Sequence, residues 1–427
     1  MGGFFNLEQT KSVSRQNGRP LSCASCGMYK YVLNPKMKPF GAFKKGILNI
    51  GEAPGEEEDK KGKQWQGRAG RLLKRTYEKL GVDLFEDCLN INSVNCRPIE
   101  DGNNRTPAPH EISCCRKNVL QVIEQYKPKV IVLLGGTAIQ SMIGHRFKKD
   151  LGGISKWRGF NIPDRDFNAW VCPVYHPSYI MRQERKDTEV IWERDLKKAL
   201  SMIKSPLPAY VNEREEVEII KDREDIRKEL IHFNMGSVWP DPSIVSFDIE
   251  TSGLKPHDTS KHFIACMSLC DNPSSVKVFP DLLKRKSQRE ALKILLQNPG
   301  IGKIAANMKF EETWMNVMGG FQVKPWIWDT MQAAHVLDNR PEISGLKFQT
   351  YVNFGVVDYS SEISSFLEGG DSKNANSVNR ISELLKSPEG EKKLFTYCGM
   401  DSLFEYRLAL LQMERMGVDV KEILCNQ

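Results

Sequence analysis

The first two hundred residues alternate short apolar runs with amphipathic helical patterns, and this alternation constrains the fold more than any other feature. The apolar runs are residues 46–50, 88–92, 129–135 and 169–175. Helical patterns lie between them, at residues 69–81, 110–126 and 137–144. Strands that alternate with helices form a parallel sheet with helices on both faces. The sequence therefore predicts a parallel-sheet α/β/α sandwich here, with ligands bound beyond the carboxyl ends of the strands.

A proline-containing segment divides the chain. A helical pattern ends near residue 201, and Pro206 and Pro208 follow it closely, which is typical of a linker. Further strand-like and helical patterns occur at residues 217–230, 244–254, 277–284, 303–310 and 381–416. We therefore predict two α/β domains, residues 1–203 and residues 208–427.

Charge is distributed unevenly between these domains. Residues 1–200 contain 34 Lys and Arg against 22 Asp and Glu, whereas residues 201–427 contain 27 against 32. The basic first domain suits a polyanion such as DNA as its partner. The acidic second domain can also act on DNA, provided that its carboxylates hold metal ions.

The composition also limits where the protein works. No apolar run approaches the roughly 18 residues of a membrane span, so no membrane partner is expected. The amino terminus lacks the pattern of a signal peptide, which predicts a cytoplasmic protein. Eleven Cys, an odd number, then favour buried thiols or a metal site over a disulfide framework.

Five of the cysteines form a candidate metal-binding set. Cys23 and Cys26 are a CxxC pair, Cys96 lies in Asn-Cys-Arg-Pro, and Cys114 and Cys115 are adjacent. Four thiolates from this set could hold zinc or a 4Fe-4S cluster. The spacing alone does not choose between the two, and a CxxC pair is also compatible with two ordinary thiols.

Three motifs in the first domain resemble those of family 4 uracil-DNA glycosylases. Residues 51–73, which begin GEAPG, are similar to the family's first motif, residues 90–98 (NINSVNCRP) to its second, and residues 175–179 (YHPSY) to its third. The resemblance implies hydrolysis of the N-glycosidic bond of a flipped uracil. It also implies a 4Fe-4S cluster whose ligands are Cys23, Cys26, Cys96 and Cys115.

The chemistry of base excision explains the side chains that the resemblance assigns. A flipped base needs an aromatic platform, here Trp65, and an amide that pairs with the uracil edge, here Asn92. His176 is placed to donate a hydrogen bond to the charge that grows on uracil O2, and Glu52 to position water or to order its turn. The expected catalytic residues are Asn92, His176 and Glu52, and the expected substrate-binding residues are Gly51, Ala53, Trp65, Gly67, Asn92 and Ser178.

Two departures from the family pattern leave an alternative open. Gln64-Trp65-Gln66 stands where the family has Pro-Phe-Val, and Asn95 stands where it has Lys. The pocket could therefore have another specificity. Alternatively, the first domain could be a DNA-binding module that derives from a glycosylase and has lost catalysis.

Acidic residues of the second domain follow the pattern of a nuclease. Asp248 and Glu250 alternate along a predicted strand and so share a face, and Tyr397 and Asp401 are one helical turn apart. Carboxylates in this arrangement can hold divalent cations that activate water for phosphodiester cleavage.

With Glu311, these residues resemble the 3′–5′ proofreading exonuclease domain of family A DNA polymerases, the DEDD class with Tyr in its last motif. The resemblance implies a ribonuclease-H-like fold and two divalent cations, Mg²⁺ or Mn²⁺. The implied metal ligands are Asp248, Glu250, Glu311 and Asp401, and the implied catalytic residues are Asp248, Glu250 and Tyr397, the last of which orients the attacking water. Glu311 stands where the family has the shorter Asp.

Together the two resemblances predict a bifunctional DNA-processing protein, both uracil-DNA glycosylase and 3′–5′ exonuclease, similar to the front part of a bacteriophage-type DNA polymerase. Residues 409–420 resemble the helix and turn that lead into a polymerase domain, and the sequence ends seven residues later. We therefore expect a polymerase that is a separate chain or was cut away. The alternatives are an exonuclease with an inactive glycosylase-derived module and a structural replisome subunit, and only the last has no need of the carboxylates.

Overall fold

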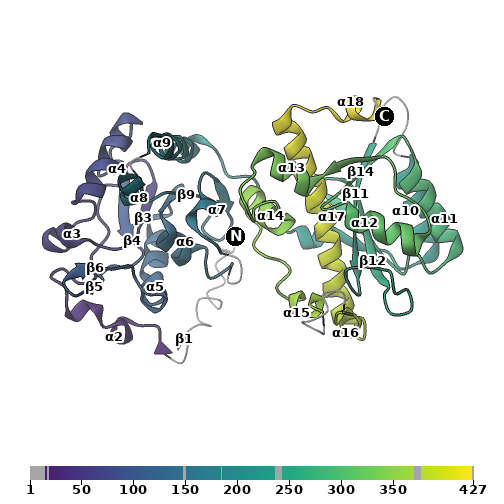
Figure 1. The fold of residues 1–427 in the computed structure, drawn as a ribbon, viewed down its shortest axis with the longest axis horizontal. Helices are drawn as coiled ribbons and strands as arrows, with labels where there is room; N and C mark the ends of the chain where they lie inside the picture. The colour runs from purple at the N-terminus through teal and green to yellow at the C-terminus, as the bar shows by residue number, and fades with distance from the viewer. Residues whose placement is uncertain are drawn as a thin grey trace. The chain divides into compact units, whose positions relative to one another are not determined.

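The computed structural model describes residues 15–16, 19–147, 151–183, 185–235, 243–369 and 377–425, and the chain forms two compact units (Figure 1). The first comprises Met1–Tyr210 with Tyr351–Val357, and the second comprises Val211–Thr350 with Asp358–Gln427. Each unit contains its own main sheet. Among the described residues, no helix combines the length and the apolar character that crossing a membrane requires.

The main sheet of the first unit has five strands in the order β4, β3, β7, β9, β8. Their bounds are β3 (Ile47–Gly51), β4 (Cys88–Asn92), β7 (Val130–Leu134), β8 (Ile162–Asp164) and β9 (Ala169–Val174). The four predicted strands are present and parallel, which confirms the predicted sheet. Strand β8 was not predicted, and it pairs antiparallel to β9 at the edge. Two small hairpins join β1 (Arg15–Gln16) to β2 (Arg19–Pro20) and β5 (Ile99–Glu100) to β6 (Asn103–Asn104).

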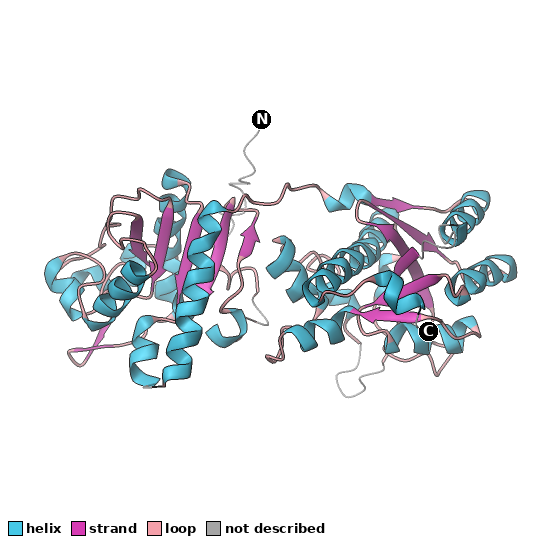
Figure 2. Ribbon diagram, turned by 90° about the horizontal axis from the view of Figure 1, so that it is seen from above, coloured by secondary structure: helices cyan, strands magenta, loops and turns pink. Residues whose placement is uncertain are grey.

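Helices cover both faces of this sheet (Figure 2). They are α2 (Cys23–Cys26), η1 (Met28–Lys30), α3 (Glu56–Lys61), α4 (Arg68–Lys79), α5 (Pro109–Tyr126), α6 (Gly136–Met142), α7 (Ile154–Trp157), α8 (Pro177–Gln183), α9 (Lys186–Ser201) and η2 (Met202–Lys204). Buried Tyr77 of α4 and Trp192 of α9 pack with Val132 and Val174 on one face. Apolar side chains of the strands and of the covering helices therefore form the core of the first unit.

The second unit contains a six-stranded sheet in the order β10, β13, β12, β11, β14, β15. Their bounds are β10 (Val217–Ile219), β11 (Ser243–Thr251), β12 (Ile264–Asn272), β13 (Ser275–Pro280), β14 (Ile301–Ala305) and β15 (Trp326–Asp329). Strands β11, β12 and β13 are antiparallel neighbours, whereas β14 and β15 continue the sheet parallel to β11. This order confirms the ribonuclease-H-like fold.

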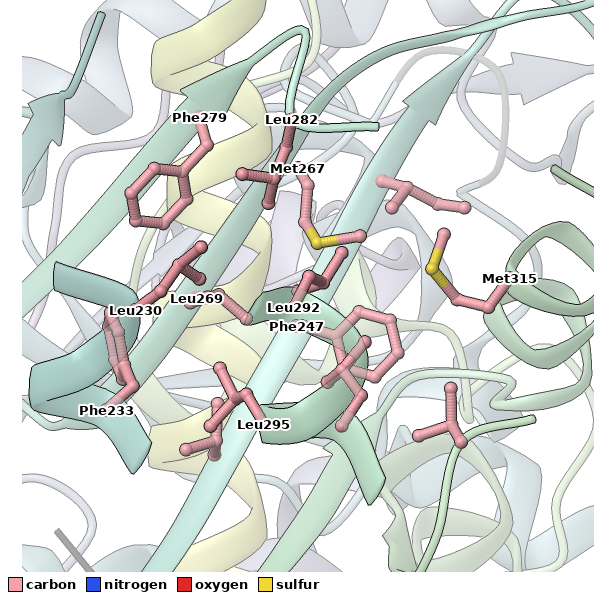
Figure 3. Close-up of a cluster of buried hydrophobic side chains, with 14 of the residues drawn as sticks. Leu230, Phe233, Phe247, Met267, Leu269, Phe279, Leu282, Leu292, Leu295 and Met315 are labelled. Atoms are coloured by element: carbon pink, nitrogen blue, oxygen red, sulfur yellow. The ribbon is translucent and has the colours of Figure 1, made fainter. Parts of the chain in front are cut away.

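The remaining helical segments follow in chain order. They are η3 (Glu213–Glu216), α10 (Arg223–Met235), α11 (Lys286–Gln297), α12 (Lys309–Trp314), the π-helical η4 (Met315–Gly319), α13 (Thr330–Leu337), α14 (Leu346–Phe354), α15 (Ser364–Leu367), α16 (Ile381–Leu384), α17 (Pro388–Met416) and α18 (Val420–Cys425). Helices α10 and α11 cover one face of the sheet, where Leu230 and Leu292 pack against Phe247 (Figure 3). The long helix α17 lies against the opposite face.

Small residues let α17 approach this sheet closely. The hydroxyls of Ser268 on β12 and Ser402 on α17 are hydrogen-bonded at 2.6 Å, and the Ser246 hydroxyl donates to the Ser402 carbonyl at 2.7 Å. A Cβ atom at Gly399 would lie 2.6 Å from Cγ1 of Val217. No side chain larger than hydrogen therefore fits at position 399 without a shift of the helix or the sheet.

We predict that Gly399→Ala destabilises the second unit by about 1–3 kcal/mol because the added methyl group overpacks this contact. The loss should occur although alanine raises helix propensity by roughly 1 kcal/mol. Urea unfolding followed by circular dichroism measures the effect. Gly345→Ala is the matched control, since a Cβ atom there meets nothing within 4 Å. Equal stability of the two variants would contradict the close contact.

Candidate active sites

Four of the residues predicted for base excision lie at one edge of the first sheet. Gly51 ends β3 and pairs with Asn92, the last residue of β4, and His176 follows the end of β9. The Trp65 and His176 rings lie 5.7 Å apart, between centroids. A Cβ atom on Gly51 would lie 2.5 Å from Asn92 Oδ1 and 3.1 Å from the Trp65 indole. The four residues therefore surround one point, and only glycine leaves room for the other side chains.

A buried polar network holds the Trp65 indole in place. Its Nε1 donates to Asn90 Oδ1 at 3.1 Å, which also accepts from Asn49 Nδ2 at 3.0 Å. The Tyr77 hydroxyl donates to Asn49 Oδ1 at 2.8 Å. The Trp65 backbone has a φ of 61°, a conformation that L-residues seldom adopt. Sequence reasoning missed Asn49 and Asn90, although two asparagines inside apolar strands were a usable signal.

The hydrogen bonds of His176 fix which ring nitrogen carries the proton. The Ser178 N–H donates to His176 Nδ1 at 3.2 Å, and the Ser178 hydroxyl lies 2.6 Å from the same atom. Because an N–H can only donate, Nδ1 is an acceptor, and in the neutral ring the proton is on Nε2. Burial and, to a smaller extent, the positive charge of Arg182 together lower the pKa of His176 to about 4. At neutral pH the ring is therefore an uncharged donor through Nε2.

Asn92 differs from the other asparagines of this site. Only 4% of its surface is exposed, and its side-chain amide has no hydrogen-bond partner within the described part of the chain, whereas Asn49 and Asn90 are fully engaged. The Asn92 amide is therefore free to pair with a bound molecule.

The other predicted residues lie around the same turn. The Glu52 carboxylate accepts from the Thr137 hydroxyl at 2.9 Å, at the start of α6. The Ala53 side chain packs against the cysteine cluster described below. The Gly67 N–H donates to Glu58 Oε1 at 2.8 Å. This N–H is thus engaged within the protein, and a substrate contact by Gly67 stays a prediction.

The predicted cysteine ligands line one cavity. Cys23 and Cys26 come from α2, Cys96 from the segment after β4, and Cys115 from α5; the lining also includes Tyr29, Lys36, Asn95, Cys114 and Asn118. Burial raises the pKa of Cys115 to about 12, and the nearby thiols Cys26, Cys96 and Cys23 also raise it. Cys114 instead lies 3.5 Å from His110 Nε2 and 3.8 Å from the Ser25 hydroxyl, measured from its sulfur. Both Cys114 and Cys115 line the cavity, so the choice of Cys115 as the fourth ligand stays a prediction.

The spacing of these sulfurs discriminates between candidate metal groups. Zinc held tetrahedrally by thiolates at about 2.3 Å brings the sulfurs within about 3.8 Å of one another. In the described chain, the one group of three such ligand atoms within 4.8 Å is Asp248, Glu250 and Cys398 of the second unit. Among the described residues, no three thiols of the first unit meet this spacing.

In the second unit, the predicted acidic residues surround a cavity of about 280 Å³ whose lining includes Asp248, Glu250, Tyr397 and Asp401. Phe247 and Ile249 point into the core on the α10–α11 side, so Asp248 and Glu250 face α17. Glu311, on α12, is 2% exposed and lies outside this lining, but its charge is close enough to act on that of Asp248. One oxygen of Asp248 and one of Glu311 are buried without a hydrogen-bond partner.

Two residues that sequence reasoning missed hold Asp401. Lys347, on α14, forms an ion pair with the Asp401 carboxylate, and the Tyr359 hydroxyl donates to the same oxygen. The Lys347 ammonium also lies 4.0 Å from the centre of the Tyr359 ring and 4.1 Å from that of Tyr397. Such cation–π contacts help to hold the Lys347 ammonium between the two rings. A lysine and a tyrosine outside any motif gave no sequence signal.

Asp329 lies in the segment Trp328–Met331, at the end of β15 and beside this site. Its carboxylate accepts from the N–H groups of Asn307 and Met308, each at 3.1 Å, and it caps α13 through Met331 at 2.9 Å. Asn307 has a φ of 70°, so the chain turns sharply there before α12. Asp329 therefore fixes the turn that positions Glu311, and its role is structural.

Several carboxyl groups lie close together around this cavity. Burial raises the pKa of Asp248, Glu250 and Glu311 well above the usual range, and the neighbouring carboxylates raise these pKa values further. Burial likewise raises the pKa of the Tyr397 phenol, as does the Asp401 charge, so its hydroxyl stays protonated. Bound cations would relieve the repulsion, and the oxygen donors are those that Mg²⁺ and Mn²⁺ prefer.

Comparisons with known proteins identify both units. Residues 38–201 match the uracil DNA glycosylase superfamily, and residues 218–408 match a 3′–5′ exonuclease family. A type-4 uracil-DNA glycosylase of Thermotoga maritima is 37% identical over 186 residues, which are 44% of this chain and 92% of that protein. A DNA polymerase of Bacillus phage SP01 is 27% identical over 333 residues, which are 72% of this chain and 34% of that polymerase. A structure of Brucella melitensis NrnC with bound Mg²⁺ covers 49% of this chain and 86% of its own, at 18% identity and a TM-score of 0.31.

We predict that His176 titrates near pH 4 in the folded protein, as NMR of its ring protons would show. Its folded pKa lies below the unfolded value of about 6.5, so its contribution to stability is present above pH 6.5 and is lost as the pH falls toward 4. Arg182→Gln should raise the pKa because it removes a nearby positive charge. Arg185→Gln, a change in an exposed ion pair with Asp187, is the control. A midpoint near 6.5 in the wild type would contradict the buried, uncharged ring.

Proposed function

Through its first unit the chain belongs to the type-4 uracil-DNA glycosylase family, and on that premise we propose that it performs two hydrolytic reactions on DNA. The first unit removes uracil, and the second removes nucleotides from a 3′ end. The observation that carries the first activity is the convergence of Trp65, Asn92 and His176 at one edge of the sheet. The buried, unpartnered carboxylate oxygens carry the second.

The glycosylase site acts on a base that has left the duplex. The Trp65 indole, anchored through Asn90, provides a rigid surface for the flipped ring. The Asn92 amide offers both a donor and an acceptor to the uracil edge, a pattern that cytosine does not match. As the N1–C1′ bond breaks, negative charge grows on uracil O2, and the Nε2–H of neutral His176 donates to it. Glu52, held by Thr137, positions the attacking water.

A 4Fe-4S cluster bound by Cys23, Cys26, Cys96 and Cys115 fits the cysteine cavity. Such a cluster would order the segments that surround it, without taking part in base excision. The cavity adjoins β4, because Cys96 lies four residues after Asn92, the last residue of that strand. The Cys96 sulfur also accepts the Lys36 N–H at 3.3 Å. Cluster ligation would thereby stabilise the turn that carries Asn92. Reduced thiols of this kind favour the cytoplasm as the compartment.

The exonuclease site hydrolyses the terminal phosphodiester. Two divalent cations at the carboxylates, when bound, activate the attacking water and neutralise charge on the phosphate. Asp248, Glu250, Glu311 and Asp401 supply the oxygen ligands. The protonated Tyr397 hydroxyl orients the water, and Lys347 and Tyr359 keep the Asp401 carboxylate in a fixed orientation.

A DNA polymerase is the partner that these two activities suit. Removal of a mismatched 3′ nucleotide and of uracil both serve a polymerase that copies the same strand. The similarity to a phage DNA polymerase supports this association, whether the polymerase is a separate chain or a further part of the same polypeptide. Co-purification with a polymerase encoded nearby tests it.

We predict that the anaerobically purified protein contains about four iron atoms per chain and absorbs visible light. Cys115→Ala should lose this iron, because the resemblance to the type-4 glycosylases assigns the fourth ligand to Cys115. Cys114→Ala, the matched control on the next residue, should keep it. Elemental analysis provides the measurement, and stoichiometric zinc with no iron would contradict the cluster.

Separate variants should abolish the two activities independently. We predict that Asn92→Ala eliminates uracil release but preserves 3′–5′ degradation, and that Asp248→Ala does the reverse. The measurement uses an end-labelled oligonucleotide with a single uracil, in EDTA or in Mg²⁺. Uracil release needs no added metal and leaves an alkali-labile site, whereas exonuclease action needs Mg²⁺ and produces a ladder. DNA affinity of Asn92→Ala should stay within a few fold, since phosphate contacts supply most of it.

Two outcomes would contradict this proposal. If the wild type releases no uracil from single- or double-stranded DNA, the first unit is a binding module. If degradation survives Asp248→Ala, the carboxylate site is not the nuclease.

A further inference from the structure

Two exposed apolar side chains lie on the loop that follows the first two cysteines. Tyr31, at the end of η1, is 79% exposed, and Leu33, two residues later, is 71% exposed. Scattered apolar side chains are normal on a protein surface, so whether these two bind anything depends on what holds and surrounds them.

Buried contacts hold this loop in one conformation. The Asp59 carboxylate, on a residue that is 1% exposed, accepts the Leu33 N–H at 3.2 Å and the Asn34 N–H at 2.8 Å. The Asn34 amide donates to the Asp59 carbonyl in return. Val32, between the two exposed residues, packs against the cysteine cluster. Tyr31 and Leu33 therefore project from a support that is already ordered, which lowers the entropic cost of binding a partner.

The same segment of the chain is basic. Residues 28–45 contain five lysines and no Asp or Glu. Lys30, Lys36 and Lys38 are exposed, and within the described chain they form no ion pair with a carboxylate. The Lys36 ammonium lies 5.1 Å from the centre of the Tyr29 ring, a contact that leaves its charge uncompensated. A polyanion is therefore the partner that suits this surface.

The loop is attached to the motif that carries the predicted base platform. The Lys38 carbonyl accepts from Gln64 Nε2 at 2.8 Å, and Gln64 directly precedes Trp65. Asp59, which fixes the other part of the loop, belongs to the same motif, residues 51–73. The exposed pair and the three lysines thus share their support with the site at which a flipped base is expected.

We propose that Tyr31, Leu33 and these three lysines form a binding surface for single-stranded DNA. An exposed aromatic ring on a rigid support stacks on a base of any identity, provided that the base is unpaired. Lysines beside the ring bind the phosphates on either side of that base. A duplex offers this surface only its phosphates, because its bases are stacked on one another. The inference deepens the proposed function of the first unit and rests on it, since it names the form of DNA that the unit binds.

Fluorescence anisotropy with the full-length protein tests this surface. The probes are a short single strand without uracil and the corresponding duplex, both in EDTA and with each 3′ end blocked by biotin-bound streptavidin. The second unit then has neither a free 3′ end nor metal ions. Tyr31→Ala should weaken single-strand binding at least about fivefold, the lower end of what one base stacked on an aromatic ring contributes, and should leave duplex binding within about twofold.

Three further variants serve as controls. Tyr31→Phe keeps the ring and should bind the single strand as the wild type does. Val190→Ala, which shortens a 65% exposed side chain on α9, should change neither affinity. Lys38→Gln should reduce the slope of log affinity against log salt concentration by about 0.7 for the single strand, because one phosphate contact is lost.

A measurement on the wild type covers the possibility that Tyr31→Ala folds poorly. Because the Tyr31 ring is exposed, Tyr31→Ala should melt at the wild-type temperature. If it does not, the wild type is irradiated with a single strand that contains 5-iodocytosine, a base that crosslinks to aromatic side chains stacked on it. Mass spectrometry should then find the crosslink on Tyr31.

The outcomes separate this surface from the proposed glycosylase activity. Unchanged single-strand binding by folded Tyr31→Ala, an equal loss on single strand and duplex, or a crosslink that avoids Tyr31 would each overturn the surface. Uracil release by the wild type is assayed separately and would stand in all three cases. A wild type that releases no uracil but loses single-strand affinity in Tyr31→Ala would overturn the glycosylase and keep the surface.

Discussion

The close contact between helix α17 and its sheet decides where the chemistry of the second unit occurs. Ser402 and Ser268 are hydrogen-bonded through their hydroxyls, and Gly399 leaves no room for a side chain between helix and strands. Because helix and sheet touch at these small residues, Tyr397 and Asp401 project along one side of the contact. Asp248 and Glu250 come to meet them from β11. Larger side chains at Gly399 or Ser402 would push α17 away from the sheet and so move the carboxylates of helix and strand apart.

The first unit solves a comparable positioning problem with buried amides. Asn49 and Asn90 lie among apolar residues inside β3 and β4. Their side chains connect the Tyr77 hydroxyl to the Trp65 indole through hydrogen bonds. A satisfied polar network in a low-dielectric interior fixes orientation more strictly than apolar packing does. The same strands end at Gly51 and Asn92, so the platform and the reading amide share one rigid support.

The two sites use opposite electrostatics. In the first unit, burial and Arg182 keep His176 neutral, which makes it a donor that does not lose its proton to an acceptor nearby. In the second unit, burial concentrates carboxylates whose repulsion is relieved only by protons or cations. Under the proposed function, the first site would act without added metal, whereas the second would need it. This difference is the physical basis for separating the two activities with EDTA.

The amino-acid sequence by itself determined the four parallel strands of the first sheet and the order of the motifs. It also determined which residues share a face, such as Asp248 and Glu250. These features depend on local periodicity, which survives without knowledge of the fold. The assignment of Trp65 as an aromatic platform and of four carboxylates as metal ligands came from motif resemblance and stays a prediction. Sequence reasoning did not find Lys347 or Tyr359, nor the structural role of Asp329.

Only the tertiary structure showed which groups these last residues contact, because their partners are distant along the chain. Lys347 and Asp401 are 54 residues apart, and Tyr359 and Asp401 are 42 apart. No period of two or of 3.6 residues connects such pairs. Their proximity depends on how closely α17 packs on the sheet and on the turn that Asp329 fixes before α12. Local pattern thus placed each functional group on its element, while long-range packing chose which groups share a site.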